Sequence, residues 1–348
     1  MPEQSTLVDI KGLQTYFHLA EGTVRAVDGV DLQIERQRTL GIVGESGCGK
    51  SIMSLSMLRL VPPPGKIEEG EILYYKTVKQ ENGNPSPNLA DVINITSLDS
   101  NSPVLHDIRG NQISMVFQEP MTAMSPVLTI GKQITEVIEQ HQHVSKAEAR
   151  RQAIEMLGRV KMSRPERVID DYPFQLSGGM RQRAVIAMAL CCRPHLLIAD
   201  EPTTALDVTT EAQILDLMRN LQAEFGMAIL YITHNLGVIA EMAEEVAVMY
   251  LGKIVEQTSV KNIFFTPLHP YTRGLLQSIP QLSDAVARHD SKRRLQTIKG
   301  MVPDPYARLK GCPFHPRCPE MIADVCDQVE PKVTTPEPDH LVRCHLYS

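Results

Sequence analysis

Two glycine-rich stretches of the sequence contain residue types suited to binding phosphate. The first fits the pattern G-x-x-x-x-G-K-[ST] at every position, and its residues are Gly44, Glu45, Ser46, Gly47, Cys48, Gly49, Lys50 and Ser51. Glycines let the backbone wrap closely around phosphates, so we expect Lys50 to meet the β- and γ-phosphates of a nucleotide and Ser51 to ligate Mg²⁺. This stretch predicts a nucleoside triphosphate site.

The second stretch, Ser177-Gly178-Gly179, has no lysine and precedes a run of helix formers that starts at Met180. Backbone N–H groups at a helix N-terminus have no partner within the helix, and the helix dipole makes that end attractive to anions. The sequence thus predicts a second anion-binding element in the same chain, whose purpose needs an explanation.

Two adjacent acids follow a short apolar run near the middle of the chain. The run "HLLIAD" is typical of a buried parallel strand and ends at Asp200, with Glu201 next. Because ligands collect at the carboxyl edge of a parallel sheet, we expect Asp200 to hold Mg²⁺ and Glu201 to orient or deprotonate an attacking water. The alternative is that the two acids only lie at a solvent-exposed edge of the sheet. The phosphate-binding stretch is expected in the same sheet, which favours a catalytic role for the acids.

The segments around these residues alternate between strand-like and helix-like patterns. Apolar runs predict buried strands at residues 39–44, 195–200 and 228–234. Helical spacing predicts helices over residues 50–61 and 208–226. Prolines 62–64 stop the first helix, while Thr209 or Thr210 is expected to cap the start of the second and Gly226 its end. The alternation predicts an α/β fold with a parallel-rich sheet.

Three regions depart from this alternation. Residues 129–193 have helical patterns throughout and predict a helical subdomain inserted into the sheet domain, and the polar residues 74–104 predict a surface excursion. After residue 266 prolines become frequent and four of the seven cysteines follow. We therefore expect a nucleotide-binding domain over residues 1–265 and a C-terminal extension over 266–348.

Composition narrows the possible locations and partners. The net charge of −6 argues against a general nucleic-acid-binding protein, which is more often basic. No apolar run approaches the roughly 20 residues of a membrane span, and the N-terminus lacks the features of a signal peptide. These features predict a protein of the cytosol, where clustered cysteines favour a metal site over disulfides.

Four motifs in order along the chain resemble those of ATP-binding cassette (ABC) ATPases, which are P-loop NTPases. They are the Gly44–Ser51 loop, "LSGGM" at 176–180, "LLIADEPTTALD" at 196–207, and His234 within "ITHN". The resemblance implies that His234 contacts the γ-phosphate. It also implies that Gln118, in "MVFQEP", joins Ser51 and Asp200 at Mg²⁺ and links the nucleotide site to the helical subdomain.

The same resemblance implies two further residues and a quaternary arrangement. Phe17 resembles the aromatic residue that stacks on adenine, with neighbouring Tyr16 as the alternative, and Asp207 resembles an aspartate that communicates across a dimer. In this family two ATPase domains associate head to tail and sandwich each ATP between them. The resemblance thus explains the second anion-binding element, because Ser177–Gly179 would close over the nucleotide of the partner.

The C-terminal third resembles that of peptide-importer ATPases, the dipeptide and oligopeptide group. Three segments carry this resemblance: "PLHPYTRGLL" at 267–276, "GCPFHPRCP" at 311–319, and residues 109–131. The third departs from the group's pattern, because Met124-Ser125-Pro126 replaces the usual Leu-Asn-Pro. It implies an ATPase subunit at the cytoplasmic face of the membrane. Its partners would be a like or unlike second ATPase, two permease subunits and an external peptide-binding protein. Import of nickel or an oligosaccharide, and a soluble ATPase that remodels protein or nucleic acid, are the alternatives.

The clustered cysteines, Cys312, Cys318, Cys326 and Cys344, have the spacing C-x5-C-x7-C-x17-C. Such spacing differs from the C-x2-C pairs of structural zinc sites. The resemblance to peptide-importer ATPases implies a [4Fe–4S] cluster, which takes four thiolates. Zinc, mixed ligation that includes His315 or His345, and reduced cysteines without metal are the alternatives.

Overall fold

The structure is a computed structural model that describes residues 5–76, 92–118, 123–204, 206–278 and 298–348. Its centre is a large mixed sheet in the order β11-β12-β10-β9-β3-β8-β7-β6. The strands are β3 (Thr39–Val43), β6 (Ile113–Val116), β7 (Leu196–Asp200), β8 (Ala228–Ile232), β9 (Glu245–Tyr250), β10 (Lys253–Ser259), β11 (Val333–Glu337) and β12 (His340–Arg343). The five strands from β9 to β6 run parallel, and β10, β12 and β11 pair antiparallel at the other edge. The α/β fold with a parallel-rich sheet is confirmed.

A second, four-stranded antiparallel sheet lies beside the first and was not predicted. Its strands, in the order β2-β1-β4-β5, are β1 (Thr6–Leu19), β2 (Gly22–Glu35), β4 (Gly65–Tyr75) and β5 (Val92–Asn94). The prediction of a surface excursion from residue 74 is wrong at both ends, because Tyr74 is fully buried in β4 and β5 pairs with that strand. The middle of that excursion, residues 77–91, lies outside the described residues. A short helix, α2 (Pro103–Asp107), follows β5.

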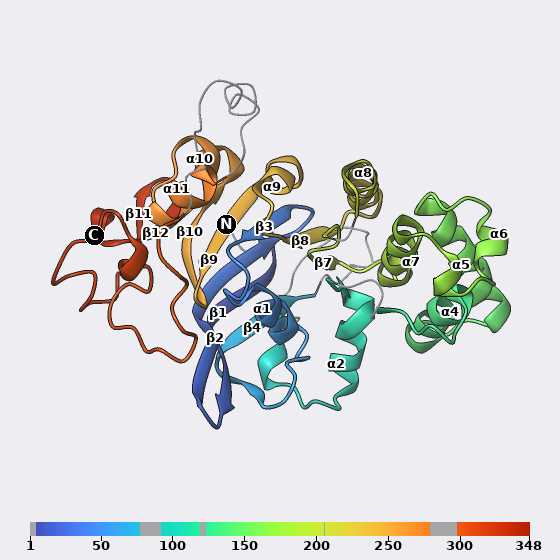
Figure 1. Cartoon of the computed structure of the whole chain (residues 1–348). Helices are drawn as coiled ribbons and strands as arrows, with labels where there is room; N and C mark the ends of the chain where they lie inside the picture. The colour runs from blue at the N-terminus through green and yellow to red at the C-terminus, as the bar shows by residue number, and fades with distance from the viewer. Residues whose placement is uncertain (1–4, 77–91, 119–122, 205, 279–297) are drawn as a thin grey trace, which may run out of the picture.

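Helices connect the parallel strands and cover the large sheet (Figure 1). The predicted helices after β3 and β7 are α1 (Lys50–Met57) and α8 (Val208–Phe225), and α9 (Leu236–Met242) follows β8. Gly226 ends α8 in a left-handed conformation, as expected. The expected N-cap of α8 is wrong, because Asp207 caps the helix by accepting a hydrogen bond from the Thr210 N–H, 3.0 Å away. Thr209 and Thr210 lie inside the first turn.

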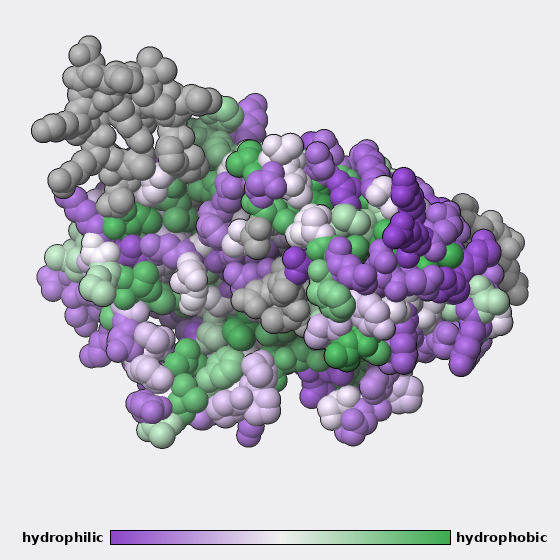
Figure 2. Space-filling view, turned by 45° about the vertical axis from the view of Figure 1, so that its right-hand side comes forward, coloured by the Kyte–Doolittle hydropathy of each residue, from purple (hydrophilic) through white to green (hydrophobic). Residues whose placement is uncertain are grey.

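A helical lobe lies at one side of the molecule, at the right of Figure 1. It contains α4 (Ile130–His141), α5 (Lys146–Arg159), α6 (Pro165–Val168) and α7 (Gly178–Leu190). Ile130, Ile134 and Ile138 repeat at helical spacing along α4 and are fully buried against the lobe's core. Figure 2 shows mostly hydrophilic side chains on the side where this lobe comes forward, as expected for the outer faces of amphipathic helices.

The C-terminal residues are joined to the large sheet rather than standing apart from it. After β10 come α10 (Val260–Phe265) and α11 (Pro270–Gln277), and β12 then pairs with β10. Phe314 is buried beside Tyr250 and Tyr271, with ring centroids 5.3 Å from each. The division at residue 265 stays a prediction. Within the described ranges, no helix combines the length and apolar character needed to cross a membrane.

Candidate nucleotide-binding site

The glycine-rich loop joins β3 to α1, which is the context predicted for it. Gly49 adopts φ 107°, and a Cβ atom there would lie 2.0 Å from the carbonyl oxygen of Ala26, so a side chain at this position would clash with the backbone. The ammonium group of Lys50 is buried and donates hydrogen bonds to the carbonyl oxygens of Gly44, 2.8 Å away, and Glu45, 3.1 Å away. The loop is thereby closed around a positive charge.

Asp200 ends β7 and is 4% exposed. Burial raises the pKa of its carboxyl group, although a hydrogen bond with Ser51 opposes that rise. Its Oδ1 atom is buried and has no hydrogen-bond partner among the described residues. A buried carboxylate oxygen without a partner, next to a serine hydroxyl, fits the oxygen ligands that Mg²⁺ prefers.

Glu201 follows Asp200, and three side chains donate to its carboxylate. His234 Nδ1 lies 2.9 Å from Oε1, while Gln118 Nε2 and Thr204 Oγ1 lie 3.1 and 3.0 Å from Oε2. Burial favours the neutral acid, but the hydrogen bonds from His234 and Thr204 and the nearby Lys50 charge together outweigh it, so the pKa of Glu201 is lowered. Its backbone has φ 47°, a strained conformation for a residue with a side chain. The structure thus holds an ionised carboxylate in one orientation.

A cavity of about 830 Å³ brings together residues from distant parts of the sequence. Its lining includes these predicted site residues: Phe17, Ser46, Gly47, Gly49, Lys50, Ser51, Gln118 and Glu201. Phe17 on β1 lines this cavity and Tyr16 does not. The Tyr16 hydroxyl instead donates a hydrogen bond to Asp28, 2.5 Å away.

Ser177–Gly179 form the N-terminus of α7, as predicted, but do not line the cavity. Ser177 caps the helix by accepting a hydrogen bond from the N–H of Met180. A Cβ atom on Gly179 would lie 2.7 Å from Thr210 Cγ2, so glycine lets α7 approach the start of α8, which Asp207 caps. In the described structure, this predicted anion-binding element is therefore not part of the cavity that its own chain forms.

The C-terminal extension contacts the phosphate loop, which sequence reasoning did not predict. The guanidinium of Arg317 donates to both carboxylate oxygens of Glu45, at 2.6 and 3.0 Å, and its side chain is 4% exposed. The hydroxyl of Tyr271 accepts a hydrogen bond from the Glu45 N–H, 2.9 Å away. Glu45 thus faces the extension with both its side chain and its N–H. A lone arginine in the run "GCPFHPRCP" was the available sequence signal.

The four clustered cysteines belong to one small region of the extension. Cys312 N–H donates to the Cys326 carbonyl oxygen, 2.8 Å away. Burial and the charges of the other three thiols raise the pKa of Cys312 to about 12, and burial similarly raises that of Cys344 to about 11. The donor chemistry fits a thiolate-ligated metal, but the described residues contain no group of three or more His, Cys, Asp or Glu arranged to hold one.

Comparisons with known proteins agree with this architecture. The ABC transporter family model matches residues 27–204, and the model of the oligopeptide/dipeptide transporter C-terminal region matches residues 255–326. The oligopeptide transport ATP-binding protein AppD of Bacillus subtilis is 48% identical over 99% of this chain and 97% of its own length. The dipeptide transport ATP-binding protein DppD of the same organism is 43% identical over 98% of this chain and 94% of its own length.

Solved structures show the same fold in the core. The dimeric structure of MJ0796, a bacterial ABC transporter cassette, is 28% identical, with a TM-score of 0.60 over 73% of this chain and 99% of that chain. The chain therefore belongs to the ABC transporter family and is an ATP-binding subunit of its oligopeptide and dipeptide transporter group.

Proposed function

We propose that this chain hydrolyses ATP to energise the import of dipeptides or oligopeptides through partner permease subunits. The observation that carries the proposal is the Glu201 carboxylate, held by three donors at the edge of a cavity that also contains the phosphate loop. The C-terminal region and the names of the similar proteins support a peptide as the solute. The subunit would work at the cytoplasmic face of the membrane, as a peripheral protein.

Each site residue has a proposed role in hydrolysis. Lys50 and the loop N–H groups hold the β- and γ-phosphates, and Phe17 packs against the base. Glu201 accepts a proton from the attacking water, which requires the carboxylate to be ionised and correctly oriented. Gln118 and His234 would fix that orientation by their hydrogen bonds to Glu201, and the exposed His234 ring would contact the γ-phosphate.

Mg²⁺ is the metal whose ligands the site would supply. We propose that Ser51, Asp200 and Gln118 hold it, since the orphaned Oδ1 of Asp200 and the Ser51 hydroxyl are oxygen donors of the required kind. When bound, Mg²⁺ would neutralise charge on the β- and γ-phosphate oxygens.

A second ATPase subunit, like or unlike, is proposed to complete the site. Ser177–Gly179 would bind the γ-phosphate held by the partner, because the N–H groups of a helix's first turn have no acceptor within the helix and favour an anion. Asp207, next to that surface, would communicate across the dimer. Hydrolysis removes the γ-phosphate that both subunits contact, so the interactions that hold the dimer closed are lost and the two subunits can separate. An external peptide-binding protein would deliver the solute to two permease subunits.

We further propose that Cys312, Cys318, Cys326 and Cys344 hold a [4Fe–4S] cluster, with zinc and metal-free thiols as the competing possibilities. The resemblance of the C-terminal region to peptide-importer ATPases supports this, because that region supplies the four cysteines that such a cluster takes as ligands. Protein purified without oxygen should be brown and contain iron, and Cys326→Ser should lose both. Colourless, iron-free protein from the same preparation would contradict the cluster.

Membrane fractionation tests the transport function. Co-purification of the chain with permease subunits, and peptide-dependent ATPase activity after reconstitution with the binding protein, are the expected results. Stimulation by nickel or an oligosaccharide instead of a peptide would overturn the solute. A wholly soluble ATPase that DNA or a protein substrate stimulates would overturn transport.

A further inference from the structure

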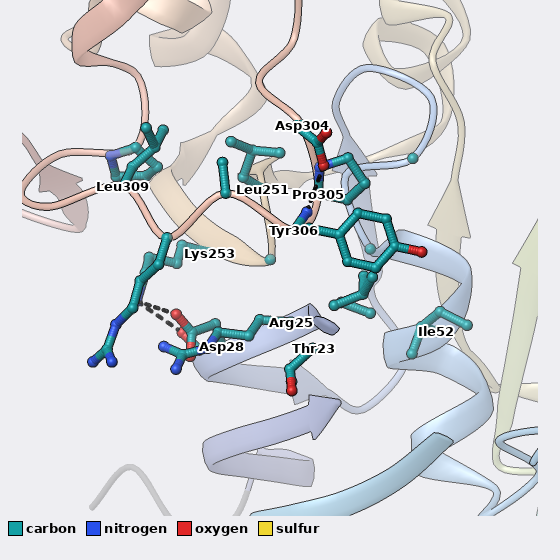
Figure 3. Close-up of a pocket in the computed structure, with 18 of the residues that line it drawn as sticks. Thr23, Arg25, Asp28, Ile52, Leu251, Lys253, Asp304, Pro305, Tyr306 and Leu309 are labelled. Carbon is teal, nitrogen blue, oxygen red and sulfur yellow. Dashed lines mark hydrogen bonds and ion pairs between the residues drawn. The ribbon is translucent and has the colours of Figure 1, made fainter. Parts of the chain in front are cut away.

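One wall of the nucleotide cavity comes from the C-terminal extension. The β1–β2 hairpin contributes Phe17 and residues 23–26, and the phosphate loop and the start of α1 contribute residues at one end. The extension contributes residues 304–311, Pro313, Gln328 and Glu330 to the lining (Figure 3). The folded chain therefore brings the N-terminal hairpin and the C-terminal extension together around one cavity.

Tyr306 is the aromatic residue of that wall. Its ring lies against the turn of the β1–β2 hairpin, because Tyr306 Cδ1 is 3.2 Å from the position that a Cβ atom on Gly22 would occupy. In Figure 3 the ring projects from the extension toward the side of the cavity that Thr23 and Ile52 line. Tyr306 is 40% exposed and lines the cavity, so part of the side chain is accessible to a ligand. The Tyr306 N–H donates to Asp304 Oδ1, 2.8 Å away.

Two charged contacts fix the extension at this position. The Lys253 ammonium lies 2.9 Å from Asp28 on the hairpin and 2.9 Å from Glu330 of the extension, so it joins the two walls. The Arg317–Glu45 pair joins the extension to the phosphate loop. The wall is therefore attached at both the base-facing side and the phosphate-facing side of the cavity.

We propose that Tyr306 stacks on the purine base of the bound nucleotide, across the cavity from Phe17. This inference rests on the proposed nucleotide site at Gly44–Ser51, since the loop fixes the phosphates and the base must then lie toward the hairpin and the extension. Aromatic rings bind bases through stacking that tolerates different bases, and the partly exposed ring of Tyr306 in the cavity wall provides such a surface. The C-terminal extension is then part of the ATP site.

Nucleotide binding to the purified full-length chain tests this role. Tyr306→Ala should raise the Kd for ADP by about 5- to 100-fold, while Tyr306→Phe keeps it near the wild-type value. Tripolyphosphate carries no base, so its Kd should not change in either variant. Phe265→Ala removes a 78% exposed aromatic side chain outside the cavity and is the matched control.

A second variant keeps the test independent of folding effects. The chain contains no tryptophan, so Tyr306→Trp introduces a single reporter whose fluorescence should change when ADP binds and stay constant with tripolyphosphate. Phe265→Trp should respond to neither ligand.

The outcomes separate this role from the site itself. Unchanged ADP affinity in Tyr306→Ala, or a Tyr306→Trp signal that ignores ADP, would overturn the stacking role and leave the phosphate loop standing. Lys50→Ala should weaken both ADP and tripolyphosphate. If Lys50→Ala weakens neither, the nucleotide site is wrong and the stacking role fails with it.

Discussion

Arg317 and Glu45 form a two-pronged ion pair that connects the cysteine-rich extension to the phosphate loop. The two residues are 272 positions apart, and the guanidinium is almost fully buried. The arginine also donates a hydrogen bond to the Tyr250 hydroxyl, 3.4 Å away. Because Glu45 belongs to the loop that would hold the phosphates, the conformation of the extension bears directly on that loop.

Loss of this pair should affect both stability and ATP binding. Arg317→Ala leaves a loop carboxylate without its partner and should lower the free energy of unfolding by about 1–3 kcal/mol. It should also raise KM for ATP severalfold. Arg317→Lys should recover part of each effect, since an ammonium cannot make the paired contact. Denaturant unfolding and steady-state kinetics of Arg317→Ala, Glu45→Gln and the double variant measure the coupling. Strictly additive effects would show that the two residues do not act together.

Glu201→Gln should separate ATP binding from hydrolysis. The amide keeps the size of the side chain but cannot accept the proton of water, so turnover should fall by at least about 100-fold while ATP still binds. The ATP-bound closed dimer should accumulate and be visible by gel filtration. Glu241→Gln, which removes a surface ion pair with Arg219, is the control and should keep normal turnover. Full turnover in Glu201→Gln would remove Glu201 from its proposed role.

Thr204→Val should shift the acidic limb of the pH–rate profile. Glu201 acts only when ionised, so activity is lost as pH falls through its pKa, which is lowered in the wild type. The valine removes one of the hydrogen bonds that lower this pKa, so the limb should move to higher pH with little change near pH 8. Thr266→Val, at the end of α10, should leave the profile unchanged. An unshifted limb in Thr204→Val would show that this hydrogen bond does not set the charge of Glu201.

His269 should make stability depend on pH. The ring is fully buried and caps α11 by accepting a hydrogen bond at Nδ1 from the Tyr271 N–H, 3.0 Å away, and burial lowers its pKa to about 3. An unfolded histidine has a pKa of about 6.5, so below that pH the unfolded chain binds a proton that the native chain excludes. Stability should therefore fall as pH drops from 6.5 toward 3, by up to about 1.4 kcal/mol per pH unit.

The variant His269→Asn isolates this contribution. Asparagine can still accept the capping hydrogen bond but does not titrate. Urea unfolding at pH 7, 6 and 5 should show a weaker pH dependence in His269→Asn than in the wild type, while His143→Asn, at an exposed site, should keep most of it. Equal pH dependence in wild type and His269→Asn would contradict the assignment.

Local patterns sufficed for the elements that carry the nucleotide chemistry. The strand–loop–helix unit at Gly44–Ser51 and helix α8 with its terminal Gly226 form through interactions between residues that are close in the sequence. Such local patterns can be recognised without knowledge of the folded chain. The four-stranded sheet escaped prediction for a physical reason. Register shifts between Ile10 and Leu13 and again at Tyr16 interrupt the two-residue alternation of β1, so its strand pattern is broken.

Contacts between distant residues could not be predicted in the same way. The pairing of β12 with β10 and the Arg317–Glu45 pair depend on how the chain returns to the large sheet after the extension. The walls of the cavity also depend on contacts between distant residues, because Tyr306 lies against the β1–β2 turn only in the folded chain. Motif spacing predicted the phosphate loop and the two acids. It carried no signal for Tyr271 and Arg317, which reach the loop from 226 and 272 positions away.

ATP turnover per chain as a function of protein concentration, measured together with sedimentation, tests the central claim most directly. Because Ser177–Gly179 do not line the cavity of their own chain, a monomer should bind ATP but hydrolyse it very slowly. Activity should appear only where a dimer forms, or on addition of the partner ATPase. A chain that sediments as a monomer and turns over ATP as fast as the dimer would contradict the proposal that two subunits share each site.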